Sequence, residues 1–124
     1  MTKVLYIEHD DDNLYMLKTR LEQCCDFKVF AAEDSEKGCK MAASEHPDLI
    51  LMDLEMPIMV RWEPVGGLKN DPHTRDIPII GLSAYALDSE REKAIATGCV
   101  EFNAKPIEFE SLIATMRRGV VKPK

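Results

Sequence analysis

The stretch PDLILMD, residues 47–53, contains an uninterrupted apolar run that ends in an acid, Asp53. A short apolar run bounded by turn residues is typical of a strand that is buried on both faces, as in a parallel sheet. Runs of the same kind recur along the chain, at residues 4–7, 27–32, 77–82 and, more weakly, 100–102. The sequence therefore predicts five buried strands, and the run at 49–52 is the third of them.

The segment after the first run has the apolar spacing of a helix. Leu14, Leu17 and Leu21 repeat at helical intervals, and Asp11 or Asp12 is the expected N-cap.

Four further helices are expected, and three of them have recognisable boundary residues. The first of these, around residues 38–42, should be capped by Ser35. Ser89 opens a capping box for another helix, which should end at Gly98, and residues 108–118 are predicted as the last helix of the chain.

Strands and helices that alternate in this way form right-handed βαβ units. The expected fold is α/β, a doubly wound five-stranded parallel sheet flanked by five helices. The third helix is the weakest, because Pro64 and the pair Gly66–Gly67 fall within it, and two interior glycines cost about 2 kcal/mol relative to alanine. We expect one domain over residues 1–120, followed by a short basic tail at 121–124, with nothing else attached.

The composition excludes several classes of protein. The chain has 124 residues and a net charge of −6, and this negative charge disfavours direct binding of nucleic acid. No apolar run approaches the roughly 20 residues that a membrane span needs, and the first residues do not resemble a signal peptide. The four cysteines, at positions 24, 25, 39 and 99, lack the spacing of a metal or redox motif, so we expect reduced packing residues in a cytoplasmic protein.

Polar residues follow the predicted strands at their carboxyl ends, where a sheet of this kind binds its ligands. They are Glu8, His9 and Asp10 after the first strand, Asp53 after the third, Ser83 after the fourth and Lys105 after the fifth. Each alone has a simpler interpretation, as a helix cap, a turn residue or part of a surface loop. Together they predict a carboxylate site for a hard divalent cation, with a lysine nearby.

Four segments carry a resemblance to a known family: VLYIEHDDDN (4–13), PDLILMDLEMPIM (47–59), IPIIGLSAYA (77–86) and GCVEFNAKPIEFESL (98–112). They resemble the receiver domain of two-component response regulators, the CheY-like family, and the likeness spans essentially the whole chain. The resemblance implies the strand order 2-1-3-4-5.

The resemblance also implies a chemistry for the site. Asp53 would accept a phosphoryl group from a sensor histidine kinase or a histidine phosphotransfer protein. Mg²⁺, with Mn²⁺ as an alternative, would be held by Glu8, Asp53 and the backbone carbonyl of Glu55. Lys105 would pair with Asp53 and then with its phosphate, and Ser83 would donate a hydrogen bond to the phosphoryl oxygen.

That hydrogen bond is also the expected switch. If Ser83 moves inward, the aromatic ring of Phe102 can rotate toward the sheet and reshape the face formed by the last strand and the last two helices. The alternative is that Phe102 is an ordinary core aromatic.

Two positions depart from the family pattern. The second acid of the family, which coordinates the cation, falls on His9, which leaves three outcomes open: Asp10 replaces it, the metal changes to manganese or zinc, or metal binding is weak. We expect weak but usable magnesium binding. The second departure is Val60-Arg61 in place of the usual Asp-Gly, so we expect a rebuilt loop there.

The most direct hypothesis is a stand-alone receiver, a monomer or weak dimer, that is no enzyme beyond its own phosphorylation and dephosphorylation. It would signal by docking to a downstream protein target, with Glu55 and Tyr85 placed to tune the phosphate lifetime. The alternative is a pseudo-receiver, an interaction module that phosphorylation does not regulate. A phosphatase or dehalogenase of the Asp-nucleophile type would need a DxDx[TV] motif, which EHDDD (8–12) does not supply.

Overall fold

The computed structural model describes residues 2–24, 27–53, 68–69, 71–83, 92, 95–96, 98–104 and 108–120. Its elements are β1 (Thr2–Ile7), α1 (Asp11–Cys24), β2 (Phe27–Ala32), α2 (Ser35–Glu45), β3 (Leu49–Asp53), β4 (Ile79–Ser83), β5 (Glu101–Ala104) and α5 (Phe109–Val120). All strand pairs are parallel and their order is β2-β1-β3-β4-β5. The expected doubly wound sheet and its strand order are therefore confirmed.

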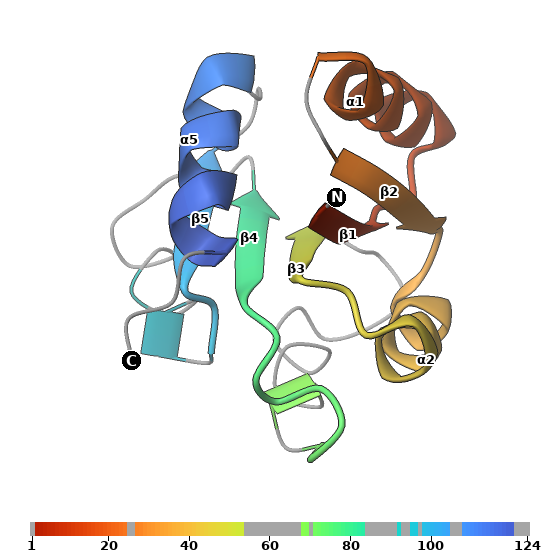
Figure 1. The fold of residues 1–124 in the computed structure, drawn as a ribbon, viewed down its shortest axis with the longest axis vertical. Helices are drawn as coiled ribbons and strands as arrows, with labels where there is room; N and C mark the ends of the chain where they lie inside the picture. The colour runs from red at the N-terminus through yellow and green to blue at the C-terminus, as the bar shows by residue number, and fades with distance from the viewer. Residues whose placement is uncertain are drawn as a thin grey trace.

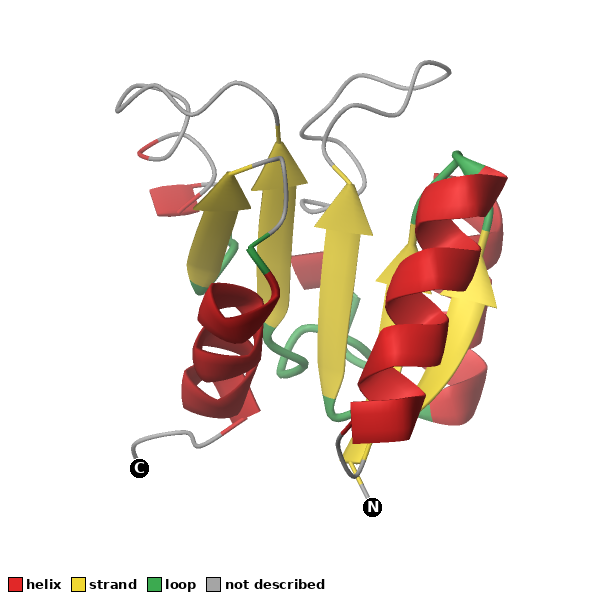
Figure 2. Cartoon of the chain, turned by 90° about the horizontal axis from the view of Figure 1, so that it is seen from above, coloured by secondary structure: helices red, strands yellow, loops and turns green. Residues whose placement is uncertain are grey.

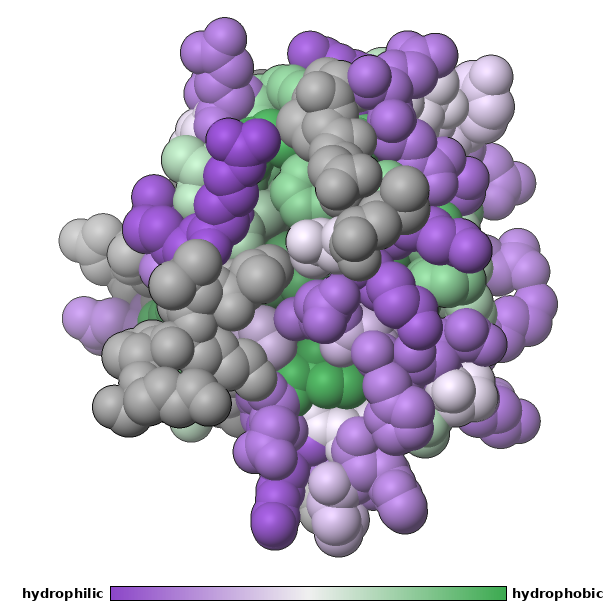
Figure 3. All heavy atoms as spheres, viewed as in Figure 1, coloured by the Kyte–Doolittle hydropathy of each residue, from purple (hydrophilic) through white to green (hydrophobic). Residues whose placement is uncertain are grey.

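Helices cover both faces of this sheet: α1 and α5 lie on one face and α2 on the other (Figure 1). Each face buries its own hydrophobic cluster. Leu5, Ile50 and Ile79 belong to the cluster under α2, whereas Leu51 and Leu82 belong to the cluster under α1 and α5. In the view of Figure 3 the outermost atoms are mainly those of hydrophilic residues, and hydrophobic ones lie recessed between them.

The five residues of β3 and the five of β4 are all buried, as expected for strands covered on both faces. The edge strand β2 differs, since Lys28 is exposed between buried neighbours. The carboxylate of Glu22, on α1, accepts a hydrogen bond of 3.1 Å from the backbone N–H of Val29. One backbone N–H group of this edge strand is thus paired within the protein.

The expected N-cap of α1, Asp11 or Asp12, is wrong. Asp10 caps this helix, because its Oδ1 accepts hydrogen bonds from the backbone N–H of Asp12 at 2.9 Å and of Asn13 at 3.1 Å. Three consecutive acids are equally good caps by residue type, and only the one in front of the first helical turn can reach these amides.

The cap of α2 and the start of α5 also lie one residue from the expected places. Asp34, in extended backbone conformation, caps α2 in place of Ser35, which is the first helical residue. Glu108, predicted as the first residue of the last helix, instead caps α5, which continues two residues beyond the expected end at Arg118. Gly98 has a φ of 139°, as suits the residue expected to follow a helix.

Several expected features lie outside the described residues. They are the weak third helix with Pro64 and Gly66–Gly67, most of the fourth helix with its cap Ser89, the Val60-Arg61 loop and the tail at 121–124.

Two of the four cysteines have described side chains, and both are free thiols, as expected. Burial raises the pKa of Cys99 to about 12 and also raises the pKa of Cys39, so both remain protonated at neutral pH. Among the described helices, none is long and apolar enough to cross a membrane.

Candidate functional site at the carboxyl edge of the sheet

The strands of the sheet all point the same way, so their carboxyl ends share one edge (Figure 2). Asp53 is the last residue of β3, Ser83 is the last residue of β4, and Glu8 directly follows β1. The register pairs Ile7 with Met52, so Glu8 and Asp53 are the next residues of two adjacent strands. Hydrogen bonding of the sheet thus brings the two acids together from 45 residues apart in the sequence.

Glu8 and Asp53 are both buried, with 0% and 1% of their surface exposed. His9 lies over them at the surface: its Nδ1 is 3.4 Å from Oδ2 of Asp53 and 3.6 Å from Oε2 of Glu8. One ligand atom from each of the three side chains falls within 4.8 Å of the other two. Two buried carboxylates at this separation repel each other unless positive charge lies between or beside them.

The carboxylate of Glu8 is held on both oxygens. The hydroxyl of Tyr6 donates a hydrogen bond of 2.9 Å to Oε1, and the backbone N–H of Asp10 donates one of 3.3 Å to Oε2. Burial, followed by the negative charge of Glu8, raises the pKa of Tyr6 above its usual value, so its hydroxyl remains a donor. Tyr6 therefore fixes the orientation of Glu8.

In the sequence, Tyr6 stands within an apolar run, and that pattern alone does not mark it as a site residue. Alternation along a strand places residues 6 and 8 on the same face, which is the signal that could have revealed the contact. A tyrosine buried two positions before a buried acid needs a hydrogen-bond partner, and the acid supplies it.

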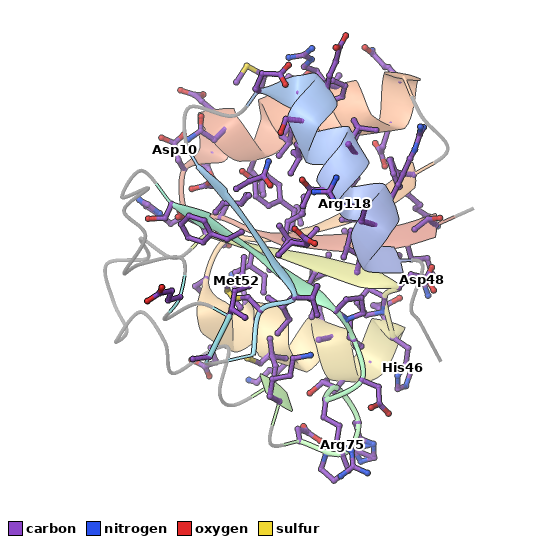
Figure 4. All side chains as sticks on the ribbon, turned by 90° about the vertical axis from the view of Figure 1, so that its left-hand side faces the viewer. Asp10, His46, Asp48, Met52, Arg75 and Arg118 are labelled. Carbon is purple, nitrogen blue, oxygen red and sulfur yellow. The ribbon has the colours of Figure 1, made fainter. Side chains whose placement is uncertain are left out.

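The structure separates the two candidates for the missing second acid. His9 lies with Glu8 and Asp53, whereas Oδ1 of Asp10 accepts the two backbone hydrogen bonds that cap α1. Figure 4 shows Asp10 at this end of the sheet, with His46 and Asp48 at the opposite end.

Ser83 and Phe102 lie on the same face of the sheet. Ser83 is fully buried. It lies four residues after Ile79 in β4 and therefore on the same face of the strand, and Ile79 belongs to the cluster under α2. Phe102 belongs to that cluster too, and it pairs with Gly81, two residues before Ser83. Phe102 is thus a core aromatic in this conformation, next to a strand position that has no side chain.

Lys105 and Glu55, the other expected members of the site, lie outside the described residues, as does Tyr85. The candidate metal ligands among the described residues are the carboxylates of Glu8 and Asp53 and the imidazole nitrogen of His9. Carboxylate oxygens are the ligands that hard divalent cations prefer, so this part of the site fits Mg²⁺ in chemistry.

The comparison with protein families agrees with this geometry. The model of the response regulator receiver domain matches residues 4–117. The chain belongs to the response regulator receiver family. Receiver domains are signalling modules of two-component systems, they bind Mg²⁺ at an acidic site, and they interact with kinases or phosphotransfer proteins and with downstream targets.

Similar proteins of this family include both curated relatives and solved structures. The polar-differentiation response regulator DivK of Brucella ovis is 30% identical over 117 residues, which cover 94% of this receiver and 95% of DivK. The chemotaxis response regulator CheY4 of Vibrio cholerae is 25% identical with a TM-score of 0.88, covering 98% of this chain and 99% of CheY4.

A third similar protein is the receiver domain of the sensor histidine kinase PA1611 from Pseudomonas aeruginosa. It is 24% identical with a TM-score of 0.85, over 96% of this receiver and 97% of that chain. That structure has a magnesium ion coordinated in its active-site cleft.

Proposed function

We propose that this receiver accepts a phosphoryl group on Asp53 from a sensor histidine kinase or a histidine phosphotransfer protein. The observation that carries the proposal is the position of Asp53. It is a buried carboxylate at the carboxyl end of a central strand, and Glu8 and His9, which follow the neighbouring strand β1, lie beside it.

In the proposed step, a carboxylate oxygen of Asp53 attacks the phosphorus of the donor phosphohistidine. The new P–O bond forms as the P–N bond breaks, and the bonding electron pair stays on the donor imidazole. The product is an aspartyl phosphate, which hydrolysis returns to the carboxylate and inorganic phosphate.

Charge is the main difficulty of this reaction, because a dianionic group approaches two buried acids. Glu8 and Asp53, with the backbone carbonyl of Glu55, would hold a divalent cation. When bound, the cation supplies positive charge against the phosphoryl oxygens. Lys105 would pair with the acceptor, and Ser83 would donate a hydrogen bond to the transferred group.

Phosphorylation would then change the face around β5. A hydrogen bond from Ser83 to the phosphoryl group would draw its side chain toward Asp53, and Phe102, on the same face of the sheet, would rotate into the space that Ser83 leaves on β4. A downstream protein target would bind this altered face.

The test is the intact mass of the full chain after incubation with a small acyl phosphate and MgCl₂. We expect one added phosphoryl group, lost again when the donor is removed. No adduct with any divalent cation would favour the pseudo-receiver, an interaction module that phosphorylation does not regulate.

A second prediction concerns Tyr6. In Tyr6→Phe, Glu8 loses the hydroxyl donor to its Oε1, and we expect divalent cations to bind about tenfold more weakly, as is usual when a partner of a metal ligand is removed. Calorimetric titration of Mg²⁺ measures this. Tyr15→Phe is the matched control, since Tyr15 is 73% exposed on α1. Wild-type affinity in Tyr6→Phe would show that the hydroxyl does not position the ligand.

A further inference from the structure

We propose that His9 is itself a metal ligand, and that it makes this receiver select later first-row transition cations such as Co²⁺ over Mg²⁺. This inference rests on one part of the proposed function, namely that Glu8 and Asp53 bind a divalent cation. It assigns a nitrogen ligand and an altered metal preference to that site.

The first argument is geometric. Nδ1 of His9 lies 3.4 Å from Oδ2 of Asp53 and 3.6 Å from Oε2 of Glu8. Both distances exceed the range of about 2.7–3.2 Å for an N–H···O hydrogen bond. They are close to the separation of about 3.0–3.5 Å between neighbouring ligands of one metal whose bonds are about 2.1 Å long. Nδ1 of His9 thus lies at the separation of neighbouring metal ligands from one oxygen of each carboxylate.

The second argument comes from the position of His9. Its side chain is 46% exposed, while the side chains of Glu8 and Asp53 are 1% and 0% exposed. A cation that reaches the two buried carboxylates from solvent therefore meets the imidazole at the surface of the site. Asp10, the nearest other acid in the sequence, caps α1 with Oδ1.

The third argument is chemical. Mg²⁺ prefers oxygen ligands, keeps several waters and gains little from a neutral nitrogen, whereas imidazole is a good ligand for cobalt, nickel and zinc. A histidine in place of a carboxylate also removes one negative charge, which weakens binding of the harder cation most. Both effects favour the transition cation over Mg²⁺.

The test compares wild type with His9→Asp by calorimetric titration of Mg²⁺ and of Co²⁺ into the full chain, without phosphodonor. We expect the ratio of the two dissociation constants, Mg²⁺ over Co²⁺, to be at least about tenfold larger in wild type than in His9→Asp. His73→Asp is the charge-matched control, because His73 is an exposed histidine in the turn before β4, and its ratio should equal that of wild type.

Pulsed EPR of the Mn²⁺-loaded proteins gives a readout that a structural role would not change. A directly bound imidazole produces nitrogen modulation of the manganese signal, which we expect in wild type and His73→Asp and not in His9→Asp. Equal selectivity in wild type and His9→Asp, or no nitrogen modulation in wild type, would overturn the inference.

These measurements also separate this inference from the proposed function. A nitrogen-bound, selective metal in a chain that takes up no phosphoryl group would support the inference and contradict phosphorylation. A chain that is phosphorylated with Mg²⁺ but shows no nitrogen ligand would do the reverse.

Discussion

Asp53→Asn is expected to take up no phosphoryl group under conditions in which the wild-type receiver gains one. The amide has nearly the volume and shape of the carboxylate, so the packing at the end of β3 is preserved. Its oxygen carries no negative charge and is a poor nucleophile toward phosphorus. The expected effect is therefore a complete loss of the adduct, measured by intact mass.

The control for this variant is Asp48→Asn. Asp48 is an exposed acid whose Oδ2 accepts a hydrogen bond of 2.9 Å from the backbone N–H of Lys3, and it lies at the opposite end of the sheet (Figure 4). We expect Asp48→Asn to be phosphorylated like wild type. An adduct that persists in Asp53→Asn would place the acceptor at another residue and would refute the proposed function.

The architecture was predictable because it depends on patterns that are local in the sequence. Strand β3 is buried along its whole length, and the uninterrupted run of residues 49–52 reports this directly. Parallel strands with alternating helices place their carboxyl ends together, so the proximity of Glu8 and Asp53 followed from topology alone.

The details of the site were less accessible, since they depend on side-chain direction. Sequence could not decide which of three adjacent acids caps α1, because all three have suitable side chains. Nor could it tell whether His9 or Asp10 would join the two buried acids. That choice follows from the first turn of α1, which engages the carboxylate of Asp10 and leaves His9 over the site.

The close approach of α2 to the sheet was also hidden in the sequence, where Gly38 looks like a poor helix residue. Gly38 is buried against Ile7 of β1, and a Cβ at position 38 would touch Cδ1 of Ile7 and lie 2.7 Å from its Cγ1. Ile7 is 0% exposed and has little room to move. The absence of a side chain therefore sets the distance between helix and strand.

Gly38→Ala should accordingly destabilise the protein, although alanine is the better helix former by about 1 kcal/mol. We expect the free energy of unfolding to fall by about 1–3 kcal/mol, the usual cost of an extra methyl group in a packed core. Urea denaturation followed by circular dichroism measures it. An unchanged or higher stability would show that α2 is free to move away from β1.

The clash itself is tested by a double-mutant cycle with Ile7→Val. Valine lacks the Cδ1 atom that the new methyl group would touch, so the second substitution should recover part of the loss, even though alone it costs about 0.5–1.5 kcal/mol. If the two losses simply add, the destabilisation by Gly38→Ala does not arise from contact with Ile7.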